Sequence, residues 1–123
     1  MAIENDWNWQ RVIDRLERIG ARYPIAREST QAMMGLVKEL RRNPALQTVT
    51  PCVSMGTLLL GREGMRRVMI AWAGDGAFRI GYDEPNDDPD GKATTHVVTV
   101  PESVVVATIL KYWNELPPLR VDE

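Results

Sequence analysis

The chain has 123 residues, of which 44% are hydrophobic and 26% charged, a composition typical of a globular domain with one apolar core. Length and composition exclude tandem domains, repeats and collagen-like or low-complexity architectures. The net charge of −2 also excludes a polycation built for nucleic acid. The charge is nevertheless uneven, because residues 1–72 hold 11 basic and 7 acidic side chains and residues 73–123 hold 4 and 10. Such an imbalance can steer a charged partner toward one part of the molecule.

The sequence favours a cytoplasmic location. Cys52 is the chain's one cysteine and cannot form an internal disulfide. The acidic N-terminal residues lack the basic and apolar regions of a signal peptide. The longest apolar runs fall far short of the roughly 20 residues that a membrane span requires. We therefore expect no contact with a membrane.

Two amphipathic helices are predicted in the N-terminal part of the chain. The first covers about residues 6–20, where the apolar side chains fall on one arc of the helical wheel. Asn5 or Asp6 can serve as its N-cap, and Gly20 is expected to end it. The second covers about residues 30–42 and is closed by an Asn-Pro pair. On the first helix, the surface opposite the apolar arc carries a row of arginines.

From residue 48 onward the apolar period changes to two, which predicts β-strands. The predicted strands lie at about residues 57–61, 66–72, 77–83 and 94–100. The second and third of these are joined by Gly74-Asp-Gly76, a strong hairpin signal. In an alternative prediction, residues 48–54 form a fifth strand at an edge of the sheet, where Pro51 is tolerated.

The valine-rich stretch near the C-terminus is ambiguous, because its composition suits a strand and its pattern suits a helix. On a helical wheel its apolar side chains occupy one arc, and Thr99-Val-Pro-Glu102 has capping-box spacing. We therefore predict a third helix at about residues 102–116. The complete prediction is a single α+β domain over residues 1–123, with the order α-α-β-β-β-β-α. Its antiparallel sheet has four strands, or five, and the helices pack on one face.

The sequence predicts no catalytic residue, no metal site and no cofactor. His96 and Cys52 are each the chain's only residue of their type, and their spacing does not require them to meet as a nucleophilic pair. The segment from Asn86 to Gly91 matches the first half of a calcium-binding loop, but Val97 stands where a bidentate glutamate is needed. A solvated loop is favoured there over a weak divalent-cation site.

The segment from residue 83 to 90 is the most acidic part of the chain and can form a docking surface for a basic protein. Its carboxylates belong to Asp83, Glu84, Asp87, Asp88 and Asp90. Because catalytic groups are scarce, this segment favours a non-catalytic protein-interaction domain. Such a domain could be an adaptor, or a protein that neutralises a basic toxin or nuclease in the manner of an immunity protein or antitoxin.

Two other functions are kept as alternatives. The first is a small-molecule-binding domain or an enzyme whose site forms at a subunit interface near His96 and Arg79. The second is weak nucleic-acid binding through the arginine row of the first helix, where an indole lies beside guanidinium groups. The residues of that surface are Trp7, Arg11, Arg15 and Arg18. A homodimer is a further expectation, through the mixed sheet face that carries Met69, Ala71 and Gly81 or through the strand region from Arg66 to Trp72.

Overall fold

The computed structural model describes residues 8–83 and 95–118 and has the predicted α+β architecture. Its helices and strands follow one another as α1 (Trp9–Arg22), α2 (Arg27–Arg41), β1 (Thr50–Ser54), β2 (Thr57–Gly61), β3 (Arg67–Gly74), β4 (Ala77–Asp83), β5 (Thr95–Pro101) and α3 (Val105–Asn114). Short 3-10 turns precede α2, β1 and α3, at Pro24–Ala26, Pro44–Leu46 and Glu102–Val104. The described order is therefore two helices, five strands and one helix.

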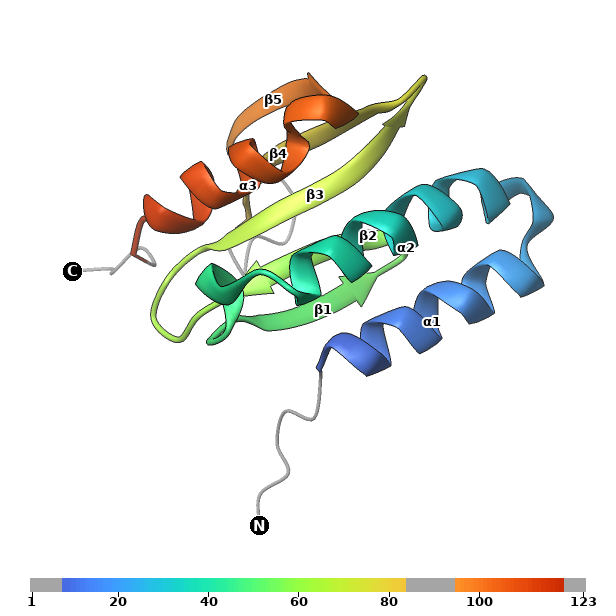
Figure 1. Cartoon of the computed structure of the whole chain (residues 1–123), viewed down its shortest axis with the longest axis horizontal. Helices are drawn as coiled ribbons and strands as arrows, with labels where there is room; N and C mark the ends of the chain where they lie inside the picture. The colour runs from blue at the N-terminus through green and yellow to red at the C-terminus, as the bar shows by residue number, and fades with distance from the viewer. Residues whose placement is uncertain (1–7, 84–94, 119–123) are drawn as a thin grey trace, which may run out of the picture.

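The five strands form one antiparallel sheet in which each strand pairs with the next along the chain (Figure 1). The alternative with a fifth strand is thereby confirmed, since β1 pairs with β2 along its whole length. β1 and β5 are the two edges of the sheet. Pro51 is compatible with β1 because a proline cannot donate to a strand ladder and is confined to edges and bulges.

Two tight turns hold neighbouring strands in register. Met55 and Gly56 connect β1 to β2, and Asp75 and Gly76 connect β3 to β4. All four residues have positive φ angles, of 52° and 85° in the first turn and 52° and 72° in the second. Positive φ at both central residues is the signature of the type I′ turn, whose twist matches that of the flanking strands. The predicted Gly-Asp-Gly hairpin is thereby confirmed.

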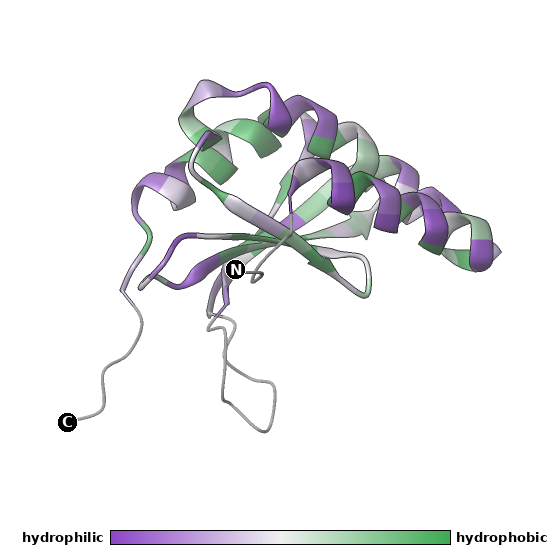
Figure 2. Cartoon of the chain, turned by 90° about the horizontal axis from the view of Figure 1, so that it is seen from below, coloured by the Kyte–Doolittle hydropathy of each residue, from purple (hydrophilic) through white to green (hydrophobic). Residues whose placement is uncertain are grey.

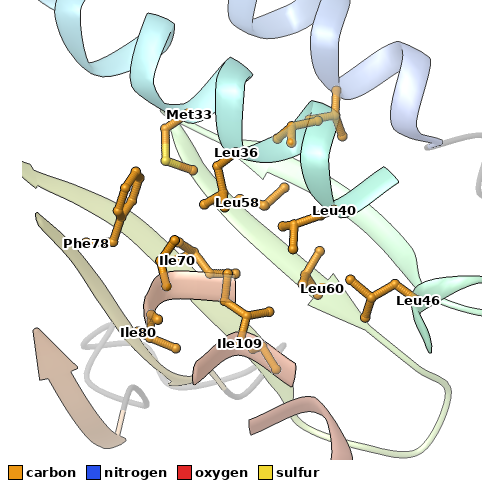
Figure 3. Close-up of a cluster of buried hydrophobic side chains, with 14 of the residues drawn as sticks. Met33, Leu36, Leu40, Leu46, Leu58, Leu60, Ile70, Phe78, Ile80 and Ile109 are labelled. Atoms are coloured by element: carbon orange, nitrogen blue, oxygen red, sulfur yellow. The ribbon is translucent and has the colours of Figure 1, made fainter. Parts of the chain in front are cut away.

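The helices cover one face of the sheet (Figure 2). α1 lies along β1 and α3 packs over β4 and β5 (Figure 1), while α2, which packs beside α1, contacts β3. The core lies between these two layers, and Figure 3 shows side chains of α2 and α3 meeting those of β2, β3 and β4. Its buried members include Leu16, Met33, Leu40, Leu46, Leu58, Leu60, Ile70, Ile80, Ile109 and Trp113. Removal of this apolar surface from water is the main stabilising contribution to the fold.

α1 is displaced along the chain relative to its prediction. It begins after Asn8, whose side chain accepts a hydrogen bond of 2.9 Å from the backbone N–H of Arg11 and so caps the helix. The prediction that Gly20 ends the helix is wrong, since α1 continues to Arg22. Gly20 instead allows α1 and α2 to approach closely, because a β-carbon there would lie 2.6 Å from Oγ1 of Thr30.

The predicted starts of α2 and α3 also require correction. α2 begins at Arg27 rather than at residue 30. The hydroxyls of Ser29 and Thr30 instead donate hydrogen bonds to backbone carbonyls of the preceding turn. The capping box of α3 is absent, because Thr99 pairs with Arg79 inside the sheet and a 3-10 turn precedes the helix. The boundaries of the four predicted strands agree with the structure to within two residues.

Substitution of Gly20 by alanine tests the close approach of α1 and α2. Alanine improves helix propensity by about 1 kcal/mol. Its β-carbon would, however, displace the buried Thr30 hydroxyl from hydrogen bonds whose loss costs about 1–3 kcal/mol. We expect Gly20→Ala to lower the free energy of unfolding in urea by about 1 kcal/mol. In a Thr30→Ala background the same substitution should be neutral or stabilising, because the obstructing oxygen is gone.

Gly35→Ala in α2 is the matched control, because nothing lies within 4 Å of a β-carbon at that position. It should stabilise the protein by up to about 1 kcal/mol through helix propensity alone. Equal stabilisation by Gly20→Ala and Gly35→Ala would show that the two helices do not meet closely at Gly20.

Candidate functional site

The sheet face opposite the helices, which we call the open face, carries the side chains that alternate with the core residues. In β2, Leu58 and Leu60 belong to the core, whereas Leu59 between them does not. The same alternation applies along the other strands. The open face includes Thr50, Cys52, Ser54, Thr57, Leu59, Arg67, Met69, Ala71, Arg79, Asp83, Val97 and Thr99. In Figure 2 all three helices lie on the other side of the sheet.

Apolar and small residues form the centre of the open face. One row of directly paired residues crosses β1 to β4 and consists of Cys52, Leu59, Met69 and Gly81. Cys52 and Met69 are half-buried, and Leu59 is only 7% exposed although it lies outside the main core. A solvated face of an antiparallel sheet ordinarily presents polar side chains. The centre of this face is therefore apolar, with Met69 partly exposed and Leu59 buried, and it is a candidate contact surface.

An ion pair borders this row at one end of the strands. Arg67 on β3 and Asp83 on β4 are paired in register, and Nη2 of Arg67 contacts Oδ2 of Asp83. The aliphatic stem of Arg67 crosses Gly61, where a β-carbon would lie 3.3 Å from Cγ. The two side chains are 27% and 21% exposed, so the pair contributes about 0.2–1 kcal/mol to stability. Its chemical consequence is that Asp83 is already neutralised within the molecule.

The thiol of Cys52 lies near this ion pair. Burial raises the pKa of Cys52 above the ordinary thiol value, the Arg67 guanidinium opposes that effect, and the Asp83 carboxylate adds to it. The thiolate is the nucleophilic form of cysteine. Because the raised pKa keeps the thiol protonated at neutral pH, Cys52 is a poor nucleophile.

A second group of side chains lies on the helix side of the sheet, where β4, β5 and α3 meet. The ring of Tyr82 lies 5.7 Å from that of His96, edge-on, and 5.0 Å from that of Tyr112. The hydroxyl of Tyr112 donates a hydrogen bond of 2.9 Å to the carbonyl oxygen of His96. The guanidinium of Arg66 lies 5.9 Å from the centre of the Tyr82 ring. These four residues, the tyrosine cluster, join the start of β5 to the C-terminal part of α3.

His96 has a backbone conformation that is unusual for its residue type. Its φ is 55°, and the register of β4 and β5 shifts here, so that His96 and Val97 stand opposite Gly81. This is a β-bulge whose first residue lies in the left-handed region, a position that glycine usually takes. A non-glycine residue there costs about 1–2 kcal/mol. The hydrogen bond from Tyr112 helps to offset that cost.

The structure separates the residues that could have formed a catalytic pair. Cys52 is on β1 and His96 on β5, at the two edges of the sheet. Four strand spacings of about 4.8 Å put them about 19 Å apart, too far for direct proton exchange. His96 and Arg79 were expected to share a ligand site. They lie on opposite sides of the sheet, because His96 contacts Tyr82 on the helix side and Arg79 belongs to the open face.

Most of the predicted acidic docking surface falls outside the described residues. This applies to Glu84, Asp87, Asp88 and Asp90, and to most of the calcium-like segment. Asp83 is described and is paired with Arg67. Tyr82 pairs with Thr95 across β4 and β5. β4 therefore ends, and β5 begins, at the end of the sheet that holds the Arg67–Asp83 pair.

The arginine row of α1 is less exposed than its pattern predicts. Arg11 and Arg15 are half-buried, whereas Arg18 is exposed. Trp7 lies outside the described residues. Within the described part of α1, the arginines therefore do not form one continuous solvent-exposed surface.

A groove of about 210 Å³ runs between α1 and α2. It is lined by Leu16, Glu17, Gly20, Ala21, Arg27, Thr30, Gln31 and Met34. Small-molecule sites usually occupy about 300 Å³ or more and hold several convergent polar groups. The groove is therefore small for a ligand site, and the open face is the stronger candidate.

Comparison with known protein families, curated proteins and solved structures finds no match to this chain. No helix within residues 8–83 and 95–118 combines the length and apolar character needed to cross a bilayer. In the same ranges, no three histidine, cysteine, aspartate or glutamate side chains are grouped so that they could hold a metal ion. Geometry and charge therefore support the open face as the candidate site.

The sequence pattern missed the contribution of Cys52, Leu59 and Arg67 to this face. Leu59 stands in an unbroken run of three leucines, which shows no alternation between the two sides of a strand. The signal that could have placed it is the Met55-Gly56 turn, because a two-residue hairpin fixes the register of both flanking strands. That register pairs Leu59 with Cys52.

The reactivity of Cys52 reports on the Arg67–Asp83 pair. We expect alkylation of this thiol by iodoacetamide to require a higher pH than alkylation of an ordinary cysteine, because burial raises its pKa. Asp83→Asn removes a charge that raises the pKa, so the rate profile should move to lower pH. Arg67→Gln should move it to higher pH. Shifts in the same direction for both variants would contradict the placement of the thiol beside this pair.

Proposed function

We propose that this chain is a non-catalytic protein-interaction domain that binds a basic protein on its open face. The observation that carries the proposal is the apolar centre of that face, on a side of the sheet that no described helix covers. The helices then form the core with one side of the sheet, and the opposite side of the sheet binds the partner.

The composition of the open face supports a protein as the partner. Leu59 and Met69 lie at its centre, and charged side chains border it, with Arg79 toward one end of the strands and the Arg67–Asp83 pair toward the other. Interfaces between proteins have the same plan, an apolar centre surrounded by a polar rim. The unbranched, polarisable side chain of methionine adapts to irregular partner surfaces.

Charge supports a basic partner. Five carboxylates lie between Asp83 and Asp90, directly after β4, and residues 73–123 carry a net charge of −6. Because Arg67 neutralises Asp83, the net negative charge of this segment comes from the other four carboxylates. Such a field raises the rate at which a basic partner associates, and apolar contact on the open face then slows its dissociation.

A protein that covers the substrate-binding surface of a basic toxin or nuclease needs these properties, because surfaces that bind nucleic acid carry positive charge. Neutralisation of such a partner is the role that we propose. An adaptor would use the same surface, and the two roles differ in whether the partner's own activity is blocked on binding.

Binding by charge-reversal variants tests this proposal. The wild-type chain should capture a basic protein from a lysate of its source cells, and the purified complex should weaken steeply as salt is added. The combined substitutions Asp87→Lys, Asp88→Lys and Asp90→Lys should lower the affinity at least tenfold and reduce its salt dependence. Met69→Lys should lower the affinity similarly, because it places a charge in the apolar centre. Titration calorimetry at two salt concentrations measures both effects.

Ile25→Lys is the matched control, because Ile25 is 96% exposed in the turn between α1 and α2. It should leave the affinity unchanged, and unfolding curves establish that every variant is folded. An affinity that survives both the triple reversal and Met69→Lys would overturn the proposal. Capture of acidic proteins alone would overturn it as well.

A further inference from the structure

The outer edge of the sheet at β5 exposes much apolar surface. Among the described residues six large apolar side chains are exposed, of which two lie on β5 and a third in the 3-10 turn that follows it. Val97 and Val98 on β5 are each 38% exposed, and Val104 in the following 3-10 turn is 44% exposed. Successive side chains of a strand point to opposite faces. Val97 and Val98 therefore point to opposite faces of the sheet, and both are exposed because β5 is an edge strand.

The two edges of the sheet differ in how they are protected. At β1, Pro51 lacks a backbone donor and α1 lies along the strand (Figure 1). β5 has no described element beyond it, and it contains no charged residue from Thr95 to Pro101. Charged side chains and prolines are the usual means by which proteins prevent edge strands from pairing with another chain. The middle of β5 has neither.

The middle of β5 is self-complementary. Val97, Val98, Thr99 and Val100 are all β-branched, a class of residue that pairs well across antiparallel strands. Two-fold antiparallel pairing about Val98 sets Val98 against Val98 of the second copy on the helix side. It sets Val97 against Thr99 of the second copy on the other side. No charged side chains of β5 oppose one another, so the pairing meets no like-charge repulsion.

The two ends of β5 restrict the register of this pairing. The bulge at His96 interrupts the strand at one end, and Pro101 lacks a donor at the other. A shift of one residue would set side chains of opposite faces against each other. A shift of two residues, which centres the pairing on Thr99, would place Pro101 inside the ladder. Pairing centred on Val98 keeps Pro101 outside it.

We infer that this chain forms a homodimer in which β5 pairs antiparallel with β5 of a second copy, with the two-fold axis at Val98. This pairing joins the two sheets into one, with both helical layers on one side and both open faces on the other. The inference rests on the β5 edge alone and is independent of any partner on the open face.

Disulfide trapping at the axis tests the dimer and its register together. Val98→Cys is made in a Cys52→Ala background, so that the new thiol is the chain's only cysteine. Opposed residues of antiparallel strands have Cα atoms about 4.5–5.5 Å apart, within the range of about 4.4–6.8 Å that a disulfide spans. We expect mild oxidation to convert this variant to a cross-linked dimer at least tenfold faster than Thr99→Cys in the same background. The two Thr99 residues are two positions out of register in this pairing.

Met55→Cys in the same background controls for random collision, because Met55 is 96% exposed in the β1–β2 turn.

Sedimentation velocity should show a reversible dimer for the wild-type chain and a folded monomer for Val98→Lys, since an edge lysine blocks strand pairing. A wild-type chain that stays monomeric at high concentration would overturn the inference, and so would equal cross-linking of Val98→Cys and Met55→Cys. Faster cross-linking of Thr99→Cys would overturn the pairing about Val98. A dimer that Met69→Lys abolishes and Val98→Lys does not would place the interface on the open face and overturn it too.

Discussion

The two-residue repeat of β-strands is the constraint on which the rest of this structure depends. A strand can direct only every second side chain toward the helices, and in β1 to β4 that half supplies the buried residues that the sheet gives to the core. The other half must face away. In this chain Leu59 and Met69 occupy the centre of that second half, where a solvated sheet would carry polar side chains. The core and the candidate binding surface are therefore two consequences of one pattern.

The end of the sheet that carries the acidic segment is held on both of its sides. On the open face the Arg67–Asp83 ion pair joins β3 to β4, and on the helix side the tyrosine cluster joins β4 and β5 to α3. An exposed ion pair contributes about 0.2–1 kcal/mol, and an aromatic pair about 0.5–1.5 kcal/mol. Each contribution is modest, but together they hold Asp83 at the end of β4 and His96 near the start of β5. The connection between β4 and β5, in which the acidic segment lies, therefore starts and ends at positions that these contacts hold.

Periodicity predicted the elements of this fold well, because it reflects burial, and it predicted their ends less well. The end assigned at Gly20 was wrong because a contact with Thr30 on another helix, rather than a local turn, requires a glycine there. The predicted capping box at Thr99 was wrong because Thr99 is part of β5 and pairs with Arg79. The candidate site was only partly predictable. Composition marked the acidic segment, but the contribution of Leu59 depends on a hairpin register that a run of leucines does not reveal.

Methyl NMR of the chain labelled at its methionines tests the central claim most directly, in a titration with the basic protein that it captures. Met69 lies on the open face, Met34 lines the groove between α1 and α2, and Met33 is 1% exposed in the core. We expect the Met69 methyl resonance to shift or broaden as the partner binds, while those of Met33 and Met34 stay in place. A shift at Met34 with no change at Met69 would contradict it, because the partner would then lie on the helical layer.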